Sequence, residues 1–133
     1  MKEVYLATKN ILVVDDDDAC WLMAELIMEE LGCFCEIAVN GQEAVDKVRS
    51  GKFDLVLMDL RMPVMDGFNA TRTIRQTHKD LPVIALTGNA LAWEEGKCQA
   101  CGMNDCLTKP FQEEQLVEML LKWTSSPIIP RYN

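Results

Sequence analysis

Basic residues are scarce in this chain. Its 13 lysines and arginines are outnumbered by 21 aspartates and glutamates, which gives a net charge of −8 at pH 7. The basic residues also form no run along the sequence. The phosphate backbone of a nucleic acid would repel such a chain, so we expect no direct binding to nucleic acid.

Long apolar stretches are absent as well. No segment approaches the roughly 20 apolar residues that span a bilayer, and the opening MKEVYLATKN lacks the apolar centre of a signal peptide. We therefore expect a cytoplasmic domain that makes no membrane contact. With 133 residues, 49% of them hydrophobic, the chain fits one domain. We assign this domain to residues 10–124, with a leader or linker at 1–9 and a tail at 125–133.

The six cysteines have no secretory context that would predict a disulfide framework. They lie inside apolar segments and are expected to be reduced core residues. Cys98 and Cys101 form a C-x-x-C pair, which could be redox-active or bind zinc. The pair falls at the end of an expected helix that Gly102 closes, where the helix dipole raises a thiol pKa, so a packing role is favoured.

A pattern of short apolar strands followed by amphipathic helices occurs five times. The strands are ILVV, CEIAV, DLVLM, PVIAL and CLT. In the first helix, Met23, Ala24, Ile27 and Leu31 form an apolar stripe. The fourth helix is expected over residues 89–101. Such alternation predicts an α/β fold with three layers, in which helices cover both faces of a parallel five-stranded sheet.

Polar residues follow several of these strands. Asp15 and Asp16 follow the first strand, Asp59 the third, Thr87 the fourth and Lys109 the fifth. In a flavodoxin-like (βα)5 sheet of order 2-1-3-4-5, the first and third strands are neighbours, so these side chains converge at one edge. Clustered carboxylates of this kind suit Mg²⁺. Asp59 could then act as a nucleophile toward phosphorus, with Lys109 and the Thr87 hydroxyl binding phosphoryl oxygens.

The motifs ILVVDDD, VLMDLRMPVMDG, ALTGNA and CLTKPF, in this order and spacing, resemble the receiver domain of two-component response regulators. The resemblance spans nearly the whole chain. GMNDCLTKPF and TGNALAWEEGKCQACG are most similar to receivers attached to hybrid sensor histidine kinases.

This resemblance implies a phosphoacceptor signalling domain, not an enzyme with a separate substrate. Asp59 takes phosphate from the phosphohistidine of a histidine kinase or a histidine phosphotransfer domain. Asp16, Asp59 and the backbone carbonyl of Arg61 bind Mg²⁺, and Asp15 acts through a metal-bound water. Thr87 is the switch hydroxyl and Lys109 the phosphate-pairing cation, followed by a cis peptide bond before Pro110. The only histidine, His78, is expected at a solvated helix end, so the donor is another protein or module.

Cys106 departs from the family pattern. Receivers usually have Tyr or Phe three residues before the lysine, and the rotamer change of that ring reports the movement of the switch hydroxyl. A thiol at this position leaves the phosphorylation chemistry in place but puts the usual output mechanism in doubt.

Two other classes of function also fit parts of the sequence. Asp15 and Asp17 after the first strand resemble the nucleophile and acid of haloacid-dehalogenase-type phosphatases. Against this interpretation, the chain lacks room for a cap domain, no later strand after Lys109 supplies the additional acidic pair, and Asp59 would have no role. A pseudo-receiver that binds proteins without being phosphorylated would not need the full set of acids together with Thr87 and Lys109.

Overall fold

The computed structural model describes residues 9–124. The expected leader at 1–9, apart from Lys9, and the expected tail at 125–133 lie outside the described residues. Five parallel strands form one sheet: β1 (Asn10–Val14), β2 (Phe34–Ala38), β3 (Leu55–Asp59), β4 (Val83–Thr87) and β5 (Asp105–Thr108). Their order is β2-β1-β3-β4-β5, which confirms the predicted flavodoxin-like order 2-1-3-4-5.

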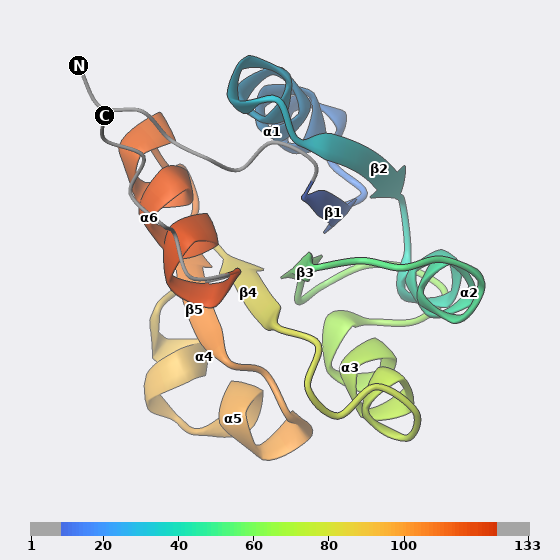
Figure 1. Ribbon diagram of the computed structural model, residues 1–133. Helices are drawn as coiled ribbons and strands as arrows, with labels where there is room; N and C mark the ends of the chain where they lie inside the picture. Colours follow the sequence, from blue (N-terminus) through green and yellow to red (C-terminus); the bar gives the residue numbers. More distant parts are fainter. Residues whose placement is uncertain (1–8, 125–133) are drawn as a thin grey trace.

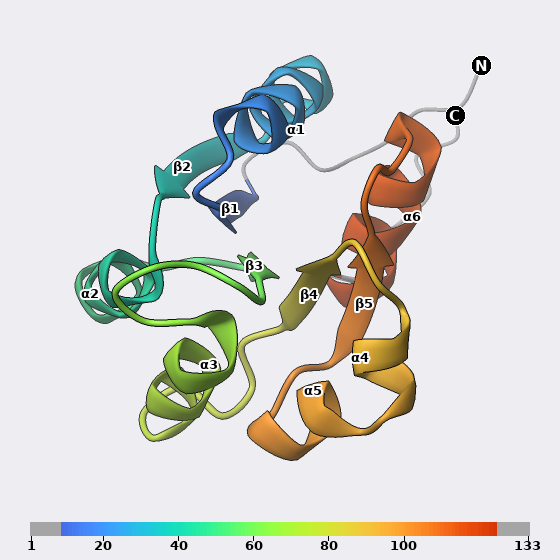
Figure 2. The same cartoon turned by 180° about the vertical axis from the view of Figure 1, so that it is seen from behind.

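The described residues also form six helical segments: α1 (Asp18–Leu31), α2 (Gly41–Ser50), α3 (Gly67–Arg75), α4 (Leu91–Glu94), α5 (Lys97–Cys101) and α6 (Glu113–Trp123). One apolar cluster packs α1 and α6 against one face of the sheet, and a second packs α2, α3 and α5 against the other. The two layers of helices are visible in Figures 1 and 2. This confirms the three-layer architecture.

The central strands are apolar because both of their faces are covered. Every residue of β3 and β4 is buried, and so are four of the five residues of β1. A strand buried on both faces reads as a continuous apolar run, not as an alternating one. The last residues of β3 and β4, Asp59 and Thr87, are therefore the exceptions that point to a site.

The prediction of one continuous fourth helix over residues 89–101 is wrong. The helix is divided into α4 and α5 at Gly96, whose φ of 81° lies in the left-handed region. A residue in this conformation turns the chain out of the helical path, and glycine adopts it without a Cβ penalty. The predicted end at Gly102 is correct, since Gly102 caps α5 with a φ of 108°.

The apolar stripe predicted for α1 is also partly wrong. Ala24 and Ile27 are buried as expected and Leu31 packs partly against the core, but the side chain of Met23 is exposed. Cys20 and Met28 are the other buried residues of the helix. The buried face is thus rotated by part of a turn from the predicted one.

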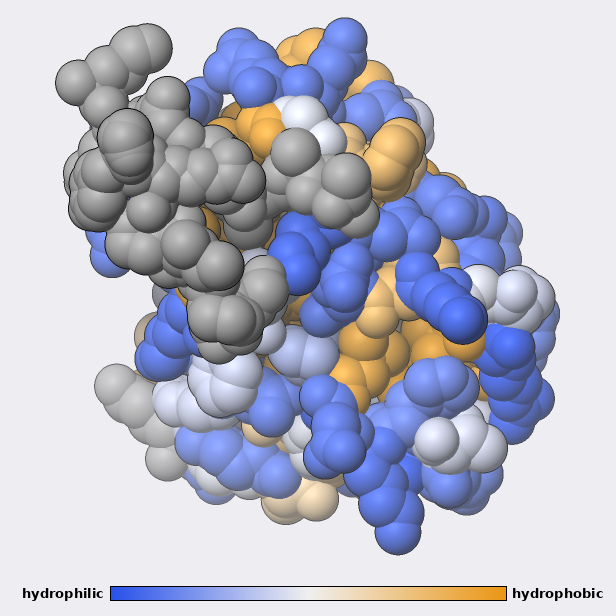
Figure 3. All heavy atoms as spheres, in the orientation of Figure 1, coloured by the Kyte–Doolittle hydropathy of each residue, from blue (hydrophilic) through white to orange (hydrophobic). Residues whose placement is uncertain are grey.

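The surface in Figure 3 is largely hydrophilic, with apolar side chains visible in a recess near its centre. Within residues 9–124, no helix combines the length and the hydropathy needed to cross a bilayer.

Candidate functional site

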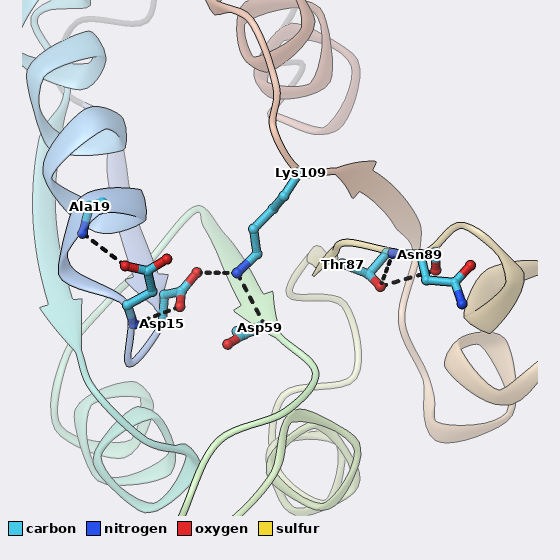
Figure 4. Close-up of polar contacts among 7 residues, drawn as sticks. Asp15, Ala19, Asp59, Thr87, Asn89 and Lys109 are labelled. Carbon is cyan, nitrogen blue, oxygen red and sulfur yellow. Dashed lines mark hydrogen bonds and ion pairs between the residues drawn. The ribbon is translucent and has the colours of Figure 1, made fainter.

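Three carboxylates meet at the edge of the sheet where the strands end. Asp15 directly follows β1 and Asp59 ends the neighbouring strand β3. Asp15 and Asp59 are buried, whereas Asp16 is exposed. Oxygen atoms of Asp15, Asp16 and Asp59 all lie within 4.8 Å of one another. Figure 2 shows the loops that leave this edge, and Figure 4 shows the side chains of Asp15 and Asp59.

Backbone contacts fix the positions of the two buried acids. The Asp15 N–H donates to the carbonyl of Ala38 at 3.0 Å, and Asp15 Oδ1 accepts from the N–H of Asp17 at 2.9 Å. The backbone of Asp59 is approached closely by Gly67, where any Cβ would overlap the Asp59 carbonyl. Glycine is therefore required at the start of α3, which explains the Asp-Gly sequence that follows the third strand.

Lys109 brings a cation between the two buried acids. Its Nζ donates to Asp15 Oδ2 at 2.7 Å and lies 3.5 Å from Asp59 Oδ1 (Figure 4). The Lys109 N–H donates to the Thr87 carbonyl at 2.7 Å, which ties the end of β5 to β4. The Lys109–Pro110 peptide bond is cis, as the resemblance to receiver domains implied.

The two carboxyl groups have opposite pKa shifts. Burial, followed by the charge of Asp15, raises the pKa of Asp59 to about 6. Burial also acts to raise the pKa of Asp15, but hydrogen bonds from Lys109, Cys20 and the Asp17 backbone hold it below 3.8. The Lys109 pKa is raised because its contacts with Asp15 and Asp59 outweigh the effect of burial. A divalent cation would favour the ionised form of Asp59.

The Thr87 hydroxyl is turned toward Asn89. Thr87 Oγ1 donates to the Asn89 carbonyl and accepts from the Asn89 N–H, both at 3.0 Å (Figure 4). Asn89 Oδ1 in turn accepts from the N–H of Leu91, the first residue of α4, at 2.9 Å. The hydroxyl is therefore linked by hydrogen bonds to the start of α4.

Two site residues were missed from the sequence. Cys20, in the first turn of α1, is buried and hydrogen-bonds to the Asp15 carboxylate. Burial, followed by this hydrogen bond, raises the pKa of the Cys20 thiol to about 12. Asn89 is the partner of the Thr87 hydroxyl. Two signals in the sequence could have indicated these contacts. Cys20 lies about one helical turn after Asp17, the cap of α1, and threonine side chains often form hydrogen bonds with the backbone two residues ahead.

Asp17 has a structural position that weakens the phosphatase interpretation. Its side chain caps α1 by accepting from the Ala19 N–H at 3.0 Å, and it is exposed. Asp59, which that interpretation leaves unused, lies beside Asp15.

The C-x-x-C pair has a packing role. Cys98 and Cys101 are buried in α5, and the Cys101 thiol donates a hydrogen bond to the Cys98 carbonyl. Burial raises the pKa of Cys98 to about 11.

Cys106 lies in β5 opposite Ala85 of β4, and is partly buried against the cluster that includes α5. Burial raises the pKa of its thiol.

Arg61 follows β3 in an exposed position next to the Pro63–Gly67 turn. The role of its carbonyl as a metal ligand stays a prediction.

Residues 11–121 match the response regulator receiver domain family. Among curated relatives, the sensor protein GacS of Pseudomonas syringae pv. syringae is 42% identical over 120 residues, covering 86% of this chain and 13% of the relative. The signal transduction histidine-protein kinase BarA of Escherichia coli (strain K12) is 36% identical over 116 residues with the same coverage. The chain thus spans 13% of the length of these relatives, about an eighth.

Two solved structures are informative. The receiver domain of the sensor histidine kinase PA1611 of Pseudomonas aeruginosa PAO1, which has a magnesium ion coordinated in its active-site cleft, matches with a TM-score of 0.82 and 38% identity, covering 89% of this chain and 98% of that one. A co-crystal structure of the Saccharomyces cerevisiae histidine phosphotransfer protein Ypd1 with the receiver domain of Ssk1 matches with a TM-score of 0.83 and 27% identity, covering 90% of each chain.

Proposed function

Because this chain belongs to the response regulator receiver domain family, we propose that Asp59 accepts a phosphoryl group from a phosphohistidine of a histidine kinase or histidine phosphotransfer protein. The observation that carries this proposal is the placement of Asp59, a buried carboxylate with the Lys109 ammonium 3.5 Å away and two further acids beside it.

The acid cluster fits Mg²⁺. All three members offer carboxylate oxygens, the hard ligands that this ion takes. Burial, followed by the charge of Asp15, raises the pKa of Asp59, and a bound cation would offset both effects. We infer that Asp16, Asp59 and the Arg61 carbonyl hold the ion, with Asp15 contacting it through water. When bound, Mg²⁺ neutralises charge on the phosphoryl oxygens and on the acids.

In the proposed reaction, a carboxylate oxygen of Asp59 forms a bond to phosphorus while the bond from phosphorus to the imidazole nitrogen breaks. The imidazole leaves with the electron pair, and Asp59 becomes an acyl phosphate. Lys109 is placed to pair with the transferred oxygens, since its amine already lies between Asp15 and Asp59. We further propose that the domain catalyses both this phosphorylation and the hydrolysis of the acyl phosphate, in which water attacks phosphorus and inorganic phosphate and the Asp59 carboxylate are released.

Thr87 would change partners in this scheme. Its hydroxyl can donate to a phosphoryl oxygen only by giving up the Asn89 carbonyl, so the hydrogen bonds that lead to α4 would change with it. With Cys106 in place of an aromatic ring, we propose that this Thr87–Asn89 link carries most of the signal and that coupling to β5 and α6 is weak.

A protein donor is supported by apolar side chains around the site. Leu22, Val39, Val64 and Leu91 are exposed, and each lies in the segment that follows one of the strands β1 to β4. Exposed apolar side chains in the segments that follow the strands are available for contact with a protein donor. We place the reaction in the cytoplasm, whose reducing conditions suit six cysteines that form no disulfide within residues 9–124.

The direct test is incubation with acetyl phosphate, followed by intact-mass measurement. We expect one added phosphoryl group in the presence of Mg²⁺, and none after chelation or in Asp59→Asn. Equal labelling of the wild type and Asp59→Asn would refute the assignment.

A further inference from the structure

A groove runs between α3 and α5, which lie side by side in Figures 1 and 2. It consists of two hollows that share Phe68 and Lys97. The inner hollow, of about 130 Å³, is also lined by Leu60, Arg61, Thr87, Asn89 and Glu95. The outer hollow, of about 290 Å³, is also lined by Asp66, Arg72 and Ala100. We call this the α3–α5 groove.

The charge of the α3–α5 groove is opposite to that of the protein as a whole. Arg61, Arg72 and Lys97 are distant in sequence but line the same groove, in a chain whose net charge is −8. They outnumber the two acids of the groove, Asp66 and Glu95. Asp66 Oδ1 is engaged as the cap of α3, since it accepts from the Asn69 N–H at 2.8 Å.

The cations of the groove have donors to offer a ligand. The ion pair between Lys97 and Glu95 is 3.7 Å long, and both side chains are more than half exposed, so it contributes little stability. Arg72 uses one nitrogen to donate to Asn69 Oδ1, whereas a guanidinium carries five N–H donors. Both cations can therefore bind carboxylates without breaking a buried contact.

Part of the lining of the α3–α5 groove is apolar. Phe68 packs partly against the core beside the buried Leu60, and its remaining surface faces both hollows. The inner hollow is well below the 300–1,000 Å³ typical of small-molecule pockets, and the outer one is at the lower limit of that range. Two small adjoining hollows with cations between them suit successive side chains of an extended peptide better than one compact ligand.

We propose that the α3–α5 groove binds an extended acidic segment of a partner protein. An apolar side chain of the segment packs on Phe68, and carboxylates on either side of it pair with Lys97 and Arg72 in the outer hollow and with Arg61 in the inner one. This binding is additional to the proposed phosphotransfer and does not require phosphorylation of Asp59.

The probe for this proposal is the acetylated, amidated pentapeptide Glu-Asp-Leu-Asp-Glu, titrated into ¹⁵N-labelled, metal-free protein. We expect saturating amide shifts centred on Phe68, Arg72 and Lys97. Binding should weaken by about tenfold in Lys97→Gln/Arg72→Gln, which corresponds to about 1.4 kcal/mol. The matched control is Lys52→Gln/Lys79→Gln, which removes two cations from the loops before β3 and β4 and should bind like the wild type.

Three results would overturn the proposal. The first is equal binding of the neutral peptide Gln-Asn-Leu-Asn-Gln, which would show that charge is not used. The second is a set of shifts located outside the groove. The third is the same shifts, with the same dependence on Lys97 and Arg72, from inorganic phosphate or ATP at equal concentration, because the groove would then be a small-anion site. Repeating the titration with Asp59→Asn, where binding should persist, separates this proposal from the phosphorylation of Asp59.

Discussion

Asp16 and Asp17 are adjacent exposed acids with different surroundings, and this difference gives a test at the scale of single residues. Asp16 belongs to the carboxylate cluster, whereas Asp17 caps α1. We expect Asp16→Ala to weaken Mg²⁺ binding by roughly tenfold or more, since it removes one full charge within a few ångströms of the ion. Isothermal titration calorimetry measures this affinity.

Asp17→Ala is the matched control. It should leave the Mg²⁺ affinity nearly unchanged but lower the free energy of unfolding by about 1 kcal/mol through loss of the helix cap. Unchanged Mg²⁺ affinity in Asp16→Ala, or an equal loss in both variants, would remove Asp16 from the ion's ligands.

The residues of the site were predictable to the extent that strand ends determine them. Asp15, Asp59, Thr87 and Lys109 come together because each ends or follows a strand of one parallel sheet. The contacts of Cys20 with Asp15, and of Thr87 with Asn89, depend instead on side-chain rotamers and on the local path of the loop. A sequence pattern does not contain this information.

At the scale of elements, Gly96 and Gly102 flank α5 and both have positive φ, of 81° and 108°. Their surroundings differ. A Cβ at Gly96 would meet no atom within 4 Å, whereas a Cβ at Gly102 would lie 2.8 Å from Cγ of Arg75. Arg75 donates to the Gly102, His78 and Leu81 carbonyls and to Asn104, so it joins the end of α3 to the start of β5.

We therefore expect Gly96→Ala to cost roughly 1 kcal/mol of unfolding free energy, from left-handed strain alone. Gly102→Ala should cost roughly 2–3 kcal/mol, because it adds displacement of Arg75 and the loss of some of its hydrogen bonds. Urea unfolding followed by circular dichroism measures both values. Equal losses of unfolding free energy in the two variants would mean that Arg75 moves without cost and does not hold α3 and β5 together.

Asp105 gives a prediction for the packing of α6 on β5. Its Oδ2 accepts from Trp123 Nε1 at 2.8 Å and from Lys122 Nζ at 3.0 Å. Partial burial acts to raise the Asp105 pKa, but these hydrogen bonds hold it below 3.8. A depressed pKa means that the ionised group stabilises the folded state above pH 3.8, and that this stabilisation is lost as the pH falls through the lower, folded-state pKa.

Asp105→Asn should thus lower the free energy of unfolding by about 1 kcal/mol at pH 7, and the difference from the wild type should shrink as the pH falls below 3.8. Urea unfolding at several pH values measures this, with the exposed Asp46→Asn as the control. A difference that is constant down to the lowest pH would show that the charge of Asp105 does not contribute.

The number and order of the strands could be read from the sequence, because the alternation of buried strands and amphipathic helices admits few topologies. The division of α4 from α5 could not, since a single glycine is tolerated in many helices and only the surrounding packing decides whether it breaks one. The choice of Met28 over Met23 for the core of α1 depends in the same way on how the helix is rotated against the sheet.

At the scale of the whole molecule, the sheet order brings acids from two strands to one edge, and the (βα)5 topology brings Thr87 and Lys109 to the same edge. The C-terminal edge of the sheet is therefore where both the receiver interpretation and the phosphatase interpretation place the chemistry. They differ in the nucleophile, which is Asp59 in the first and Asp15 in the second.

The identity of the nucleophile is measured most directly by trapping it. Protein treated with acetyl phosphate and Mg²⁺ is reduced with borohydride, which converts an aspartyl phosphate to homoserine, and the peptides are then sequenced by mass spectrometry. We predict homoserine at position 59 alone, and none when Mg²⁺ is removed. Homoserine at position 15, or a stable phosphoryl group on another residue with Asp59 unmodified, would contradict the account.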